Sequence, residues 1–497
     1  MKRQLYIFSL LVVLIFSACS DEKKEETILA RVGDKTISLN EFLRRAEYTI
    51  RPAYCRNNSN IDKKIILNSL IAEKLLSIEA GNNNSFITGS EVKMFLQGRL
   101  EQAMRQFLYN EEIKSRVKID TNKINNTVKY AGREYDVSYV SLNDTTVVKQ
   151  LTEEFFHDKA GFEKTLSENY NLKQIPEKKI IWNNLEHPVI LNTLFTRDYK
   201  KNDIIGPVKI EDDHYMFIKI KGWIYAPDVA EKQIQDRYNM VKETYEKYQS
   251  RNMYENYIRD IMKGKNLNFN KNVFFALTDI FGPLYLKNRK EKEELFKNGI
   301  WNYKNEEMKY QDTKPRLDQI RKEKLFTIDG EIWTVDKFLM EIKKHPLVFR
   351  SQSFPNKEFG LQFQLAILDL VRDKYLTAEA YKKGFDKLPE VVRDNQMWSD
   401  NINALNKKYR ILQETNSDSL FSTDHLSVLE KTLNPKIDYL QRKYSDKIFI
   451  NTEIFNKIKL TKTDMAVTYS GSPFPQVVPN FPVITSDYEL DYGNSMK

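Results

Sequence analysis

Apolar and polar positions near the start of the chain alternate first at the period of a strand and then at that of a helix. Residues 28–32 alternate loosely, and the turn Gly33-Asp34-Lys35 follows them. Ser38 stands three residues before Glu41, which predicts a capping box at the start of a helix through Arg45 and beyond. The pattern therefore predicts a short hairpin that leads into a helix.

Two longer apolar stripes at helical spacing come next. One covers residues 61–80 and is ended by Gly81, and the other covers residues 89–117. Together with the hairpin they predict a helical module over residues 28–118.

A similar sequence pattern returns in the second half of the chain. VGDKTISLNEFL at 32–43 returns as IDGEIWTVDKFL at 328–339, and EKLLSIEA at 73–80 returns as DKYLTAEA at 373–380. The offsets are 296 (328 − 32) and 300 (373 − 73), so order and spacing are kept over about fifty residues. We therefore predict a second copy of the module over residues 325–462, whose first helix is broken at His345-Pro346.

The segments between and after the copies carry weaker patterns. Residues 227–324 are basic and aromatic, and we expect a helical linker there that is interrupted at Gly282-Pro283. A helix over 426–444 precedes KIFINTEIFNKIKL, which predicts a strand and then a helix. Residues 463–497 predict an extended, proline-rich tail that either threads a partner or lies along the body.

Composition indicates a globular protein with several domains. The chain has 497 residues, 41% of them hydrophobic and 30% charged, and its length favours about three domains. The formal net charge of +9 is spread over 78 basic and 69 acidic residues. No basic arm or patch characteristic of nucleic-acid binding is present, and no nucleotide-binding motif is found.

The first residues have the pattern of an export signal. Lys2 and Arg3 precede an apolar stretch over 5–16, and small residues then lead to Cys19. This resembles a bacterial lipoprotein signal over residues 1–18, with Cys19 lipidated and residues 19–27 as a charged tether. A plain secretory peptide cut near Ala18 is the alternative.

The tether bears on where such an anchored protein would lie. Ser20 after the cysteine favours the outer membrane, and the acidic run resembles the surface-export signal of Bacteroidetes lipoproteins. A spacer without sorting information is the alternative for that run. We expect a lipid-anchored protein of the cell envelope, on the periplasmic face or the cell surface.

Cysteine and histidine usage gives no support for a metal or redox site. If Cys19 carries lipid, Cys55 is the sole remaining cysteine, and we predict that it is a small buried apolar residue. The five histidines are scattered without ligand spacing, so we expect neither a metal site nor a cofactor.

The repeated motif resembles a known family. VGDKTISLNEFL followed by LNSLIAEKLLSIEA is similar to the N-terminal chaperone region of SurA/PrsA-type periplasmic foldases. The resemblance implies a chaperone that binds unfolded or nascent exported proteins without ATP. It also implies a parvulin-type peptidyl-prolyl isomerase domain after the first module, which we expect over residues 119–226.

That segment resembles a parvulin in outline. YDVSYVSL (135–142) predicts the first strand, and residues 147–166, with AGFEKTLSENY, resemble the parvulin helix that follows. LFTRDYKKNDIIGPVKIEDDHYMFIKIKGW, at 194–223, resembles the closing hairpin of the family.

The residues expected of an active parvulin are replaced. Active members carry a histidine on the first and last strands and a glycine-rich middle segment. Here the first strand offers Ser138 and Tyr139, the last strand has Met216, and KKIIWNNL between them has no glycine. His214 lies two residues before Met216 and faces the same side by strand alternation. We expect a degenerate isomerase that is weak or inactive.

Tyrosines recur at helical spacing after this segment. Tyr238, Tyr245 and Tyr248 form a stripe in a charged background. Such a stripe serves either as packing surface or as an amphipathic surface for unfolded clients.

The sequence as a whole predicts an α+β, mainly helical protein with duplicated helical chaperone modules flanking a degenerate parvulin-like α/β domain. Three functions follow from it. The first is a membrane-anchored chaperone for exported proteins. The alternatives are an active prolyl isomerase that uses other residues, and a structural lipoprotein of an envelope or surface complex.

Overall fold

The computed structural model describes residues 26–158, 160–168, 170, 172, 174–183, 186–211, 214–226, 230–286, 314–351, 354–461, 473–474 and 477–496. The expected signal peptide, Cys19 and most of the expected tether lie outside the described residues. The fold belongs to the α+β class and is mainly helical, as predicted. The chain divides into two compact units: unit 1 holds residues up to 106, 267–373 and 377–497, and unit 2 holds 107–266 and 374–376.

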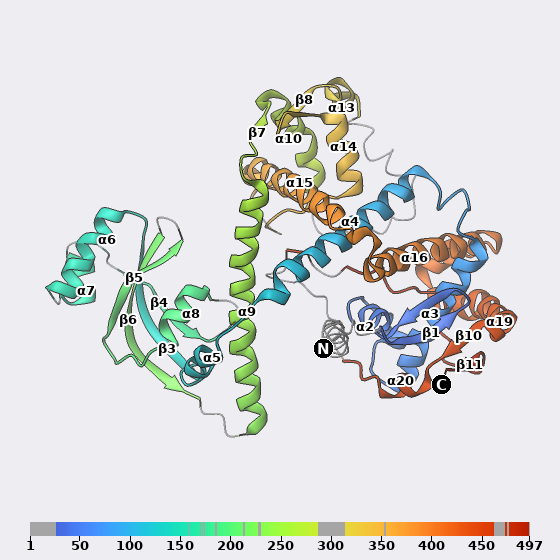
Figure 1. Cartoon of the computed structure of the whole chain (residues 1–497), viewed down its shortest axis with the longest axis horizontal. Coiled ribbons are helices and arrows are strands. Elements are labelled where there is room, and N and C mark those ends of the chain that lie inside the picture. The colour runs from blue at the N-terminus through green and yellow to red at the C-terminus, as the bar shows by residue number, and fades with distance from the viewer. Residues whose placement is uncertain are drawn as a thin grey trace, which may run out of the picture. The chain divides into compact units, whose positions relative to one another are not determined.

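One part of unit 1, here called lobe 1, is built on a four-stranded sheet in the order β11-β10-β1-β2 (Figure 1). Its hairpin turns at Gly33, whose φ of 61° lies in the left-handed region that glycine tolerates. The elements of lobe 1 are β1 (Ile28–Val32), β2 (Lys35–Ser38), α2 (Leu39–Glu47), η1 (Ala53–Cys55), α3 (Asn60–Ala80), α16 (Pro389–Glu414), α17 (Asp418–Thr423), α18 (His425–Val428), η6 (Leu429–Leu433), α19 (Asn434–Lys443), η7 (Ser445–Lys447), β10 (Ile448–Ile450), α20 (Thr452–Lys457) and β11 (Asn494–Ser495).

The other part of unit 1, here called lobe 2, has the three-stranded sheet β7-β8-β9. Its hairpin turns at Asp329 and Gly330, both with positive φ. The elements of lobe 2 are α4 (Ser90–Glu112, with residues up to 106 in unit 1), β7 (Leu267–Phe269), α10 (Lys271–Tyr285), α13 (Lys314–Ile320), β8 (Lys324–Ile328), β9 (Glu331–Thr334), α14 (Val335–Lys344), η4 (Asn356–Glu358), α15 (Phe359–Lys382) and η5 (Phe385–Lys387).

The two lobes share the order of their first elements. In each, a hairpin leads into a short helix, a 3₁₀ turn and a long helix, as β1-β2-α2-η1-α3 and as β8-β9-α14-η4-α15. The hydroxyl of Ser38 accepts a hydrogen bond from the Glu41 amide at 3.0 Å, and that of Thr334 accepts one from the Lys337 amide at 3.2 Å. The same side-chain cap therefore starts the first helix of both lobes.

Each sheet is completed by a strand from a distant part of the chain. β10 pairs antiparallel with β1, and β7 pairs antiparallel with β8 in the corresponding place. A helix follows each added strand, α20 in lobe 1 and α10 in lobe 2. Phe42 of α2 meets Phe455 of α20 at 6.3 Å between ring centroids, and Phe338 of α14 meets Phe281 of α10 at 6.5 Å.

The third helix of each copy packs on the other lobe. α4 follows α3 in sequence but contacts α14 and α15, where a Cβ at Gly98 would lie 2.1 Å from the Lys344 carbonyl oxygen. α16 follows α15 in sequence but packs along α3. Within unit 1 each lobe is therefore completed by segments that adjoin the other copy in sequence, an exchange like that in domain-swapped dimers.

The C-terminal tail lies along the body of lobe 1. Phe481 and Ile484 belong to the lobe 1 core, together with Cys55, which is buried as predicted. Strand β11 closes the tail by pairing parallel with β10. Of the two roles that the sequence left open for residues 463–497, the described part takes the second.

Unit 2 contains a four-stranded antiparallel sheet in the order β4-β3-β6-β5, covered on both faces. One core lies between the sheet and helices α5, α8 and α9, and the other lies under α6 and α7 (Figure 1). Its elements are η2 (Lys114–Arg116), α5 (Thr121–Val128), β3 (Arg133–Leu142), α6 (Thr145–Thr152), η3 (Glu153–His157), α7 (Phe162–Glu168), β4 (Glu177–Ile181), α8 (Pro188–Leu194), β5 (Ile204–Glu211), β6 (His214–Tyr225) and α9 (Glu231–Met262).

Several local expectations need correction. The helix expected over 147–166 is divided into α6 and α7, and Gly282-Pro283 does not end a helix, because α10 runs on to Tyr285. Residues 267–285 of the expected linker form β7 and α10 of lobe 2. The expected capping box is half present, because the Glu41 carboxylate contacts the Lys74 ammonium instead.

Candidate functional site

The sheet of unit 2 positions the residues that the resemblance singles out. β3 carries Ser138 and Tyr139, and β6 carries Met216 and His214. In the β3–β6 register, Tyr139 lies opposite Ile218 and Ser141 lies opposite Met216. Because residues two apart on a strand share a face, Tyr139 and Met216 emerge on the same side of the sheet.

A small pocket lies on that side. Its volume is about 70 Å³, and it is lined by Val137, Tyr139, Lys178, Ile180, Glu186, Ile190, Met216 and Ile218. The structure therefore brings two of the four sequence-predicted residues, Tyr139 and Met216, to one pocket.

The other two residues lie elsewhere. Ser138 is buried, at 2% exposed, and alternation directs it to the opposite face, where α6 and α7 pack. His214 is half-buried at the start of β6, with its Nε2 3.3 Å from the Ser141 hydroxyl. It is not among the residues that line the pocket.

The pocket is mainly aliphatic. Its charged groups are Lys178 and Glu186, whose ammonium and carboxylate are 2.5 Å apart and so neutralise each other. Its volume is well below the roughly 300 to 1,000 Å³ of ordinary ligand sites. None of the described residues that line it is a histidine. The arrangement can hold a small apolar group, and it offers Tyr139 as a hydrogen-bonding side chain.

The tyrosine stripe of α9 serves largely as packing. The Tyr245 hydroxyl lies 2.9 Å from the Thr127 hydroxyl and 3.3 Å from Oδ1 of Asn192, and the side chain is 5% exposed. Tyr238 packs against the same core, and Tyr248 is half-buried. Of the two roles left open for the stripe, client contact is therefore wrong for Tyr245, because its ring is covered by unit 2 itself.

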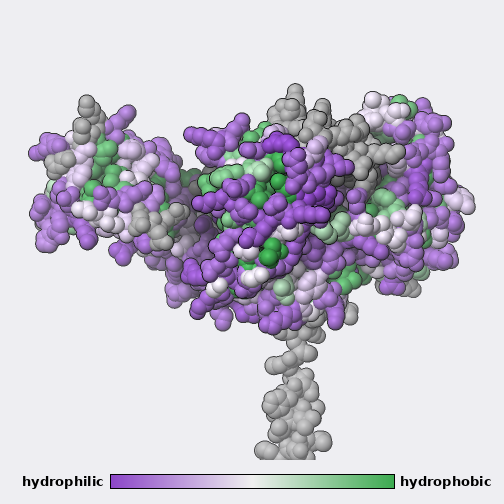
Figure 2. All heavy atoms as spheres, turned by 90° about the horizontal axis from the view of Figure 1, so that it is seen from above, coloured by the Kyte–Doolittle hydropathy of each residue, from purple (hydrophilic) through white to green (hydrophobic). Residues whose placement is uncertain are grey.

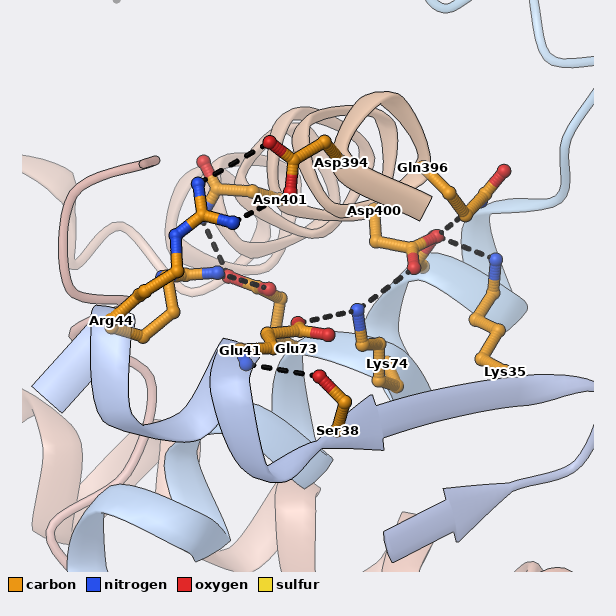
Figure 3. A network of polar contacts seen from close by, with 12 residues as sticks. Lys35, Ser38, Glu41, Arg44, Glu73, Lys74, Asp394, Gln396, Asp400 and Asn401 are labelled. Atoms are coloured by element: carbon orange, nitrogen blue, oxygen red, sulfur yellow. Dashed lines mark hydrogen bonds and ion pairs between the residues drawn. The ribbon is translucent and has the colours of Figure 1, made fainter. Parts of the chain in front are cut away.

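A second concentration of charged groups lies in lobe 1, between α3 and α16 (Figure 3). The Asp400 carboxylate of α16 lies 2.6 Å from the Lys35 ammonium and 3.0 Å from the Lys74 ammonium. The Lys74 ammonium also lies 3.0 Å from the Glu41 carboxylate. Lys35, Lys74 and Asp400 have side chains at most 5% exposed. Charged groups are rarely buried in this way unless each has a partner.

The network continues along α2. Arg45 donates two hydrogen bonds to the Glu73 carboxylate, at 2.9 and 2.8 Å, and Asn401 donates a third at 2.6 Å. Arg44 donates to Asp394 at 2.7 Å (Figure 3). Side chains from β2, α2 and α3 thus converge on one face of α16.

The electrostatics favour the charged forms of Lys74 and Asp400, whereas burial raises the pKa of Glu41. Burial opposes the ammonium of Lys74, but the carboxylates of Glu41 and Asp400 outweigh it and raise the pKa of Lys74. Burial likewise opposes the charge of Asp400, yet Lys74 and Lys35 lower its pKa. Lys74 and Asp400, which are held in their charged forms, are poor proton donors or acceptors, so we interpret the network as the joint between α16 and the first copy.

The repeated motif itself contains a signal for this joint. Glu73 and Ser77 lie in the repeated motif and correspond to Asp373 and Thr377. In lobe 1 they contact Asn401 and Asp400, and in lobe 2 Arg105 contacts both counterparts, at 3.7 and 2.7 Å. The repeated polar positions are those that hold the exchanged third helix.

Other kinds of site are not evident. Within the described ranges, no group of three or more His, Cys, Asp or Glu side chains is arranged to hold a metal ion. Of the helices that the structure describes, none combines the length and apolar content needed to cross a membrane. No protein-family model, no curated protein and no solved structure matches this chain.

Proposed function

We propose that the chain is a membrane-anchored, ATP-independent chaperone for unfolded exported proteins, and that its parvulin-like unit binds without catalysing isomerisation. The proposal combines the resemblance of the repeated motif with the placement of exposed apolar side chains. A chaperone of this kind needs apolar contacts that stay accessible because charged groups surround them.

One observation carries the client-binding part. Val348 and Ile50 are the two most exposed large hydrophobic side chains of the described residues, at 75% and 73%. Each lies in the segment between the first and second helix of its copy, α14 and α15 or α2 and α3. The face in Figure 2 is mainly hydrophilic, with hydrophobic residues in small groups, which suits weak and repeated contacts with an unfolded chain.

The pocket supports the non-catalytic part. A parvulin forms no covalent intermediate and lowers a barrier of about 20 kcal/mol by holding a twisted prolyl bond in a shaped polar site. The lining around Tyr139 and Met216 is aliphatic, and its one charged pair is internally neutralised. It suits an apolar side chain of a client better than a reacting prolyl bond.

An aggregation assay tests the proposal. A urea-denatured outer-membrane protein is diluted with and without the chain, and light scattering is followed. Suppression by the wild type is expected, and the double variant Ile50→Ser/Val348→Ser should need several-fold more protein for the same effect. Ile224→Ser, at a side chain 67% exposed in unit 2, is the matched control and should behave as wild type.

Two other outcomes would replace the proposal. Catalysed isomerisation of a proline peptide that is lost on Tyr139→Phe or Met216→Ala would make the chain an active isomerase. No suppression of aggregation, with recovery of one fixed partner in stoichiometric amount from membranes, would make it a structural lipoprotein.

A further inference from the structure

The C-terminal tail crosses lobe 1 without forming a strand until β11. Residues 477–491 belong to neither helix nor strand, yet Val478, Phe481 and Ile484 are only 8%, 6% and 0% exposed. These anchors are three residues apart, the spacing at which an extended chain with three residues per turn presents one side. The tail therefore lies in lobe 1 as an extended peptide whose buried residues recur in pairs at a three-residue spacing, Val478-Pro479, Phe481-Pro482 and Ile484-Thr485.

Lobe 1 holds this segment chiefly by its main-chain carbonyls. The donors are side chains from four different elements, and their donor–oxygen distances run from 2.9 to 3.4 Å. Arg45 donates to the carbonyl of residue 480, Lys408 to that of 483, Tyr54 and Ser69 to that of 485, and Asn68 to those of 487 and 489.

The donors are themselves buried. Arg45, Asn68 and Ser69 are 0% exposed, and burial lowers the pKa of Lys408 to about 8. Arg45 is also held by two hydrogen bonds to the Glu73 carboxylate, and Oδ1 of Asn68 accepts one from Gln441 at 2.6 Å. Donors held by the body of the lobe are preorganised, so binding a carbonyl requires little additional ordering. The donors come from α2, η1, α3 and α16 of lobe 1, and none of them comes from the tail.

Recognition of carbonyls is largely independent of sequence. Every residue has a main-chain carbonyl, whereas Pro479 and Pro482 have no amide hydrogen to offer. The selectivity that remains comes from the apolar side chains at every third position and from Asn434, which accepts a hydrogen bond from the Thr485 hydroxyl and donates one to the Ser486 hydroxyl. These are properties of a site for unfolded polypeptide rather than for one partner sequence.

We propose that the groove of lobe 1 beneath residues 477–491 binds extended segments of unfolded proteins with apolar side chains at every third residue, and that the tail is its internal occupant. This inference rests on the proposed chaperone function and assigns that function a site. An occupant in the same chain competes at an effective concentration on the order of mM, so clients bind fully only when the tail leaves.

Lobe 2 shows that the donors are not a general property of the repeat. At the positions of Asn68 and Ser69 its long helix carries Leu368 and Asp369, and Asp369 accepts hydrogen bonds from Arg350 and Arg372. The carbonyl-binding side chains are specific to the lobe over which the tail runs.

The test weakens the tail in the full-length chain. Ile484→Asp places a charge at a fully buried anchor, and Tyr488→Asp, at a tail side chain 48% exposed, is its matched control. The probe is a fluorescent 20-residue peptide of Gly and Ser with Leu at every third position. Ile484→Asp should bind the probe at least tenfold more tightly than wild type by anisotropy, Tyr488→Asp should match wild type, and adding Asn68→Leu to Ile484→Asp should cancel the gain.

A second form of the protein tests the same inference without relying on the folding of Ile484→Asp. A cleavage sequence for a site-specific protease, inserted between residues 466 and 467, lets the tail be cut after folding. The cut chain should bind a labelled tail peptide (473–497), and the Leu-repeat probe should displace it.

The outcomes separate the two proposals. If the cut chain rebinds the tail peptide but the Leu-repeat probe does not compete, or if Ile484→Asp folds without any gain in affinity, the groove serves the tail alone and the inference is overturned. Wild-type suppression of aggregation would then leave the proposed function intact. Absence of suppression in every form would remove the proposed function as well.

Discussion

Lobe 1 and lobe 2 have the same local frame but are held together by different chemistry. In lobe 1 the joint with the exchanged helix is a buried network centred on Asp400 and Glu73. In lobe 2 the core is rich in aromatic rings, with Phe363 in contact with Phe274, Phe281, Phe338 and Phe359. α4 is joined to lobe 2 by the partly buried cluster of Glu101 with Lys344 and His345.

The difference shows what a repeat preserves. The hairpin, the helix cap and the phenylalanine of the first helix recur because they determine how each lobe begins. The surfaces that receive α4 and α16 needed only to match one helix each, so their charged groups differ: Asp400 with Lys35 and Lys74 in lobe 1, and Glu101 with Lys344 and His345 in lobe 2. The added groove for the tail in lobe 1 belongs to this second, freer set of positions.

The largest expected effect comes from breaking the joint of lobe 1. Asp400→Ala leaves Lys35 and Lys74 buried without the carboxylate that they share, which costs about 3 to 5 kcal/mol. Hydrogen exchange measured by mass spectrometry should show the loss in α3 and α16, with lobe 2 helix α15 unchanged. Asp438→Ala, at an exposed pair with Arg442 on α19, is the control and should leave α3 protection as in wild type. Equal loss in both lobes would show that the lobes do not differ as described.

A smaller effect is expected at the joint of lobe 2, and it depends on pH. Burial opposes the charge of Glu101, but hydrogen bonds from His345 and Lys344 lower its pKa to about 2. The folded pKa is below the unfolded value of about 4.5, so the stabilisation is complete above that value and is lost as pH falls towards 2. The full difference corresponds to about 3 kcal/mol.

Glu101→Gln should remove that part of the acid sensitivity. Protection of α14 against exchange should fall between pH 4.5 and 2 in the wild type and change less over this range in the variant. Glu379→Gln, on the half-exposed side of α15, should retain the wild-type profile. An unchanged profile in Glu101→Gln would show that the cluster does not hold α4.

The smallest effect should be equal in the two lobes. Ser38→Ala and Thr334→Ala each remove the hydroxyl that accepts a hydrogen bond from the first turn of the helix, at about 1 kcal/mol. Each change should speed exchange only in the helix that follows it, α2 or α14. A loss confined to one lobe would contradict the equivalence of the caps.

Sequence reasoning succeeded where the interactions are local. The turn at Gly33, the cap at Ser38 and the end of α3 at Gly81 depend on neighbours within a few residues, and all three were predicted. The pairing of β1 with β10 depends on strands at opposite ends of the chain, and three-residue strands carry too little pattern to indicate a partner.

The same contrast holds for the sites. The family resemblance singled out Tyr139 and Met216, and the observed register of β3 with β6 places them on one face of the sheet. The sequence pattern did not single out Lys74 and Asp400, because charged residues usually lie at the surface and only the packing of α16 on α3 reveals their burial. Ser138 was grouped with Tyr139 by proximity in sequence, although adjacent strand residues face opposite ways.

The reciprocal completion of the lobes has a consequence for biosynthesis. During translation, β1 can pair early with β2 but cannot acquire its other neighbour, β10, until residue 450 has followed. The edge of the first hairpin, with its open amide and carbonyl groups, must therefore be shielded while most of the polypeptide is still being made. A protein of this design would therefore need protection from premature pairing until most of its chain has been synthesised.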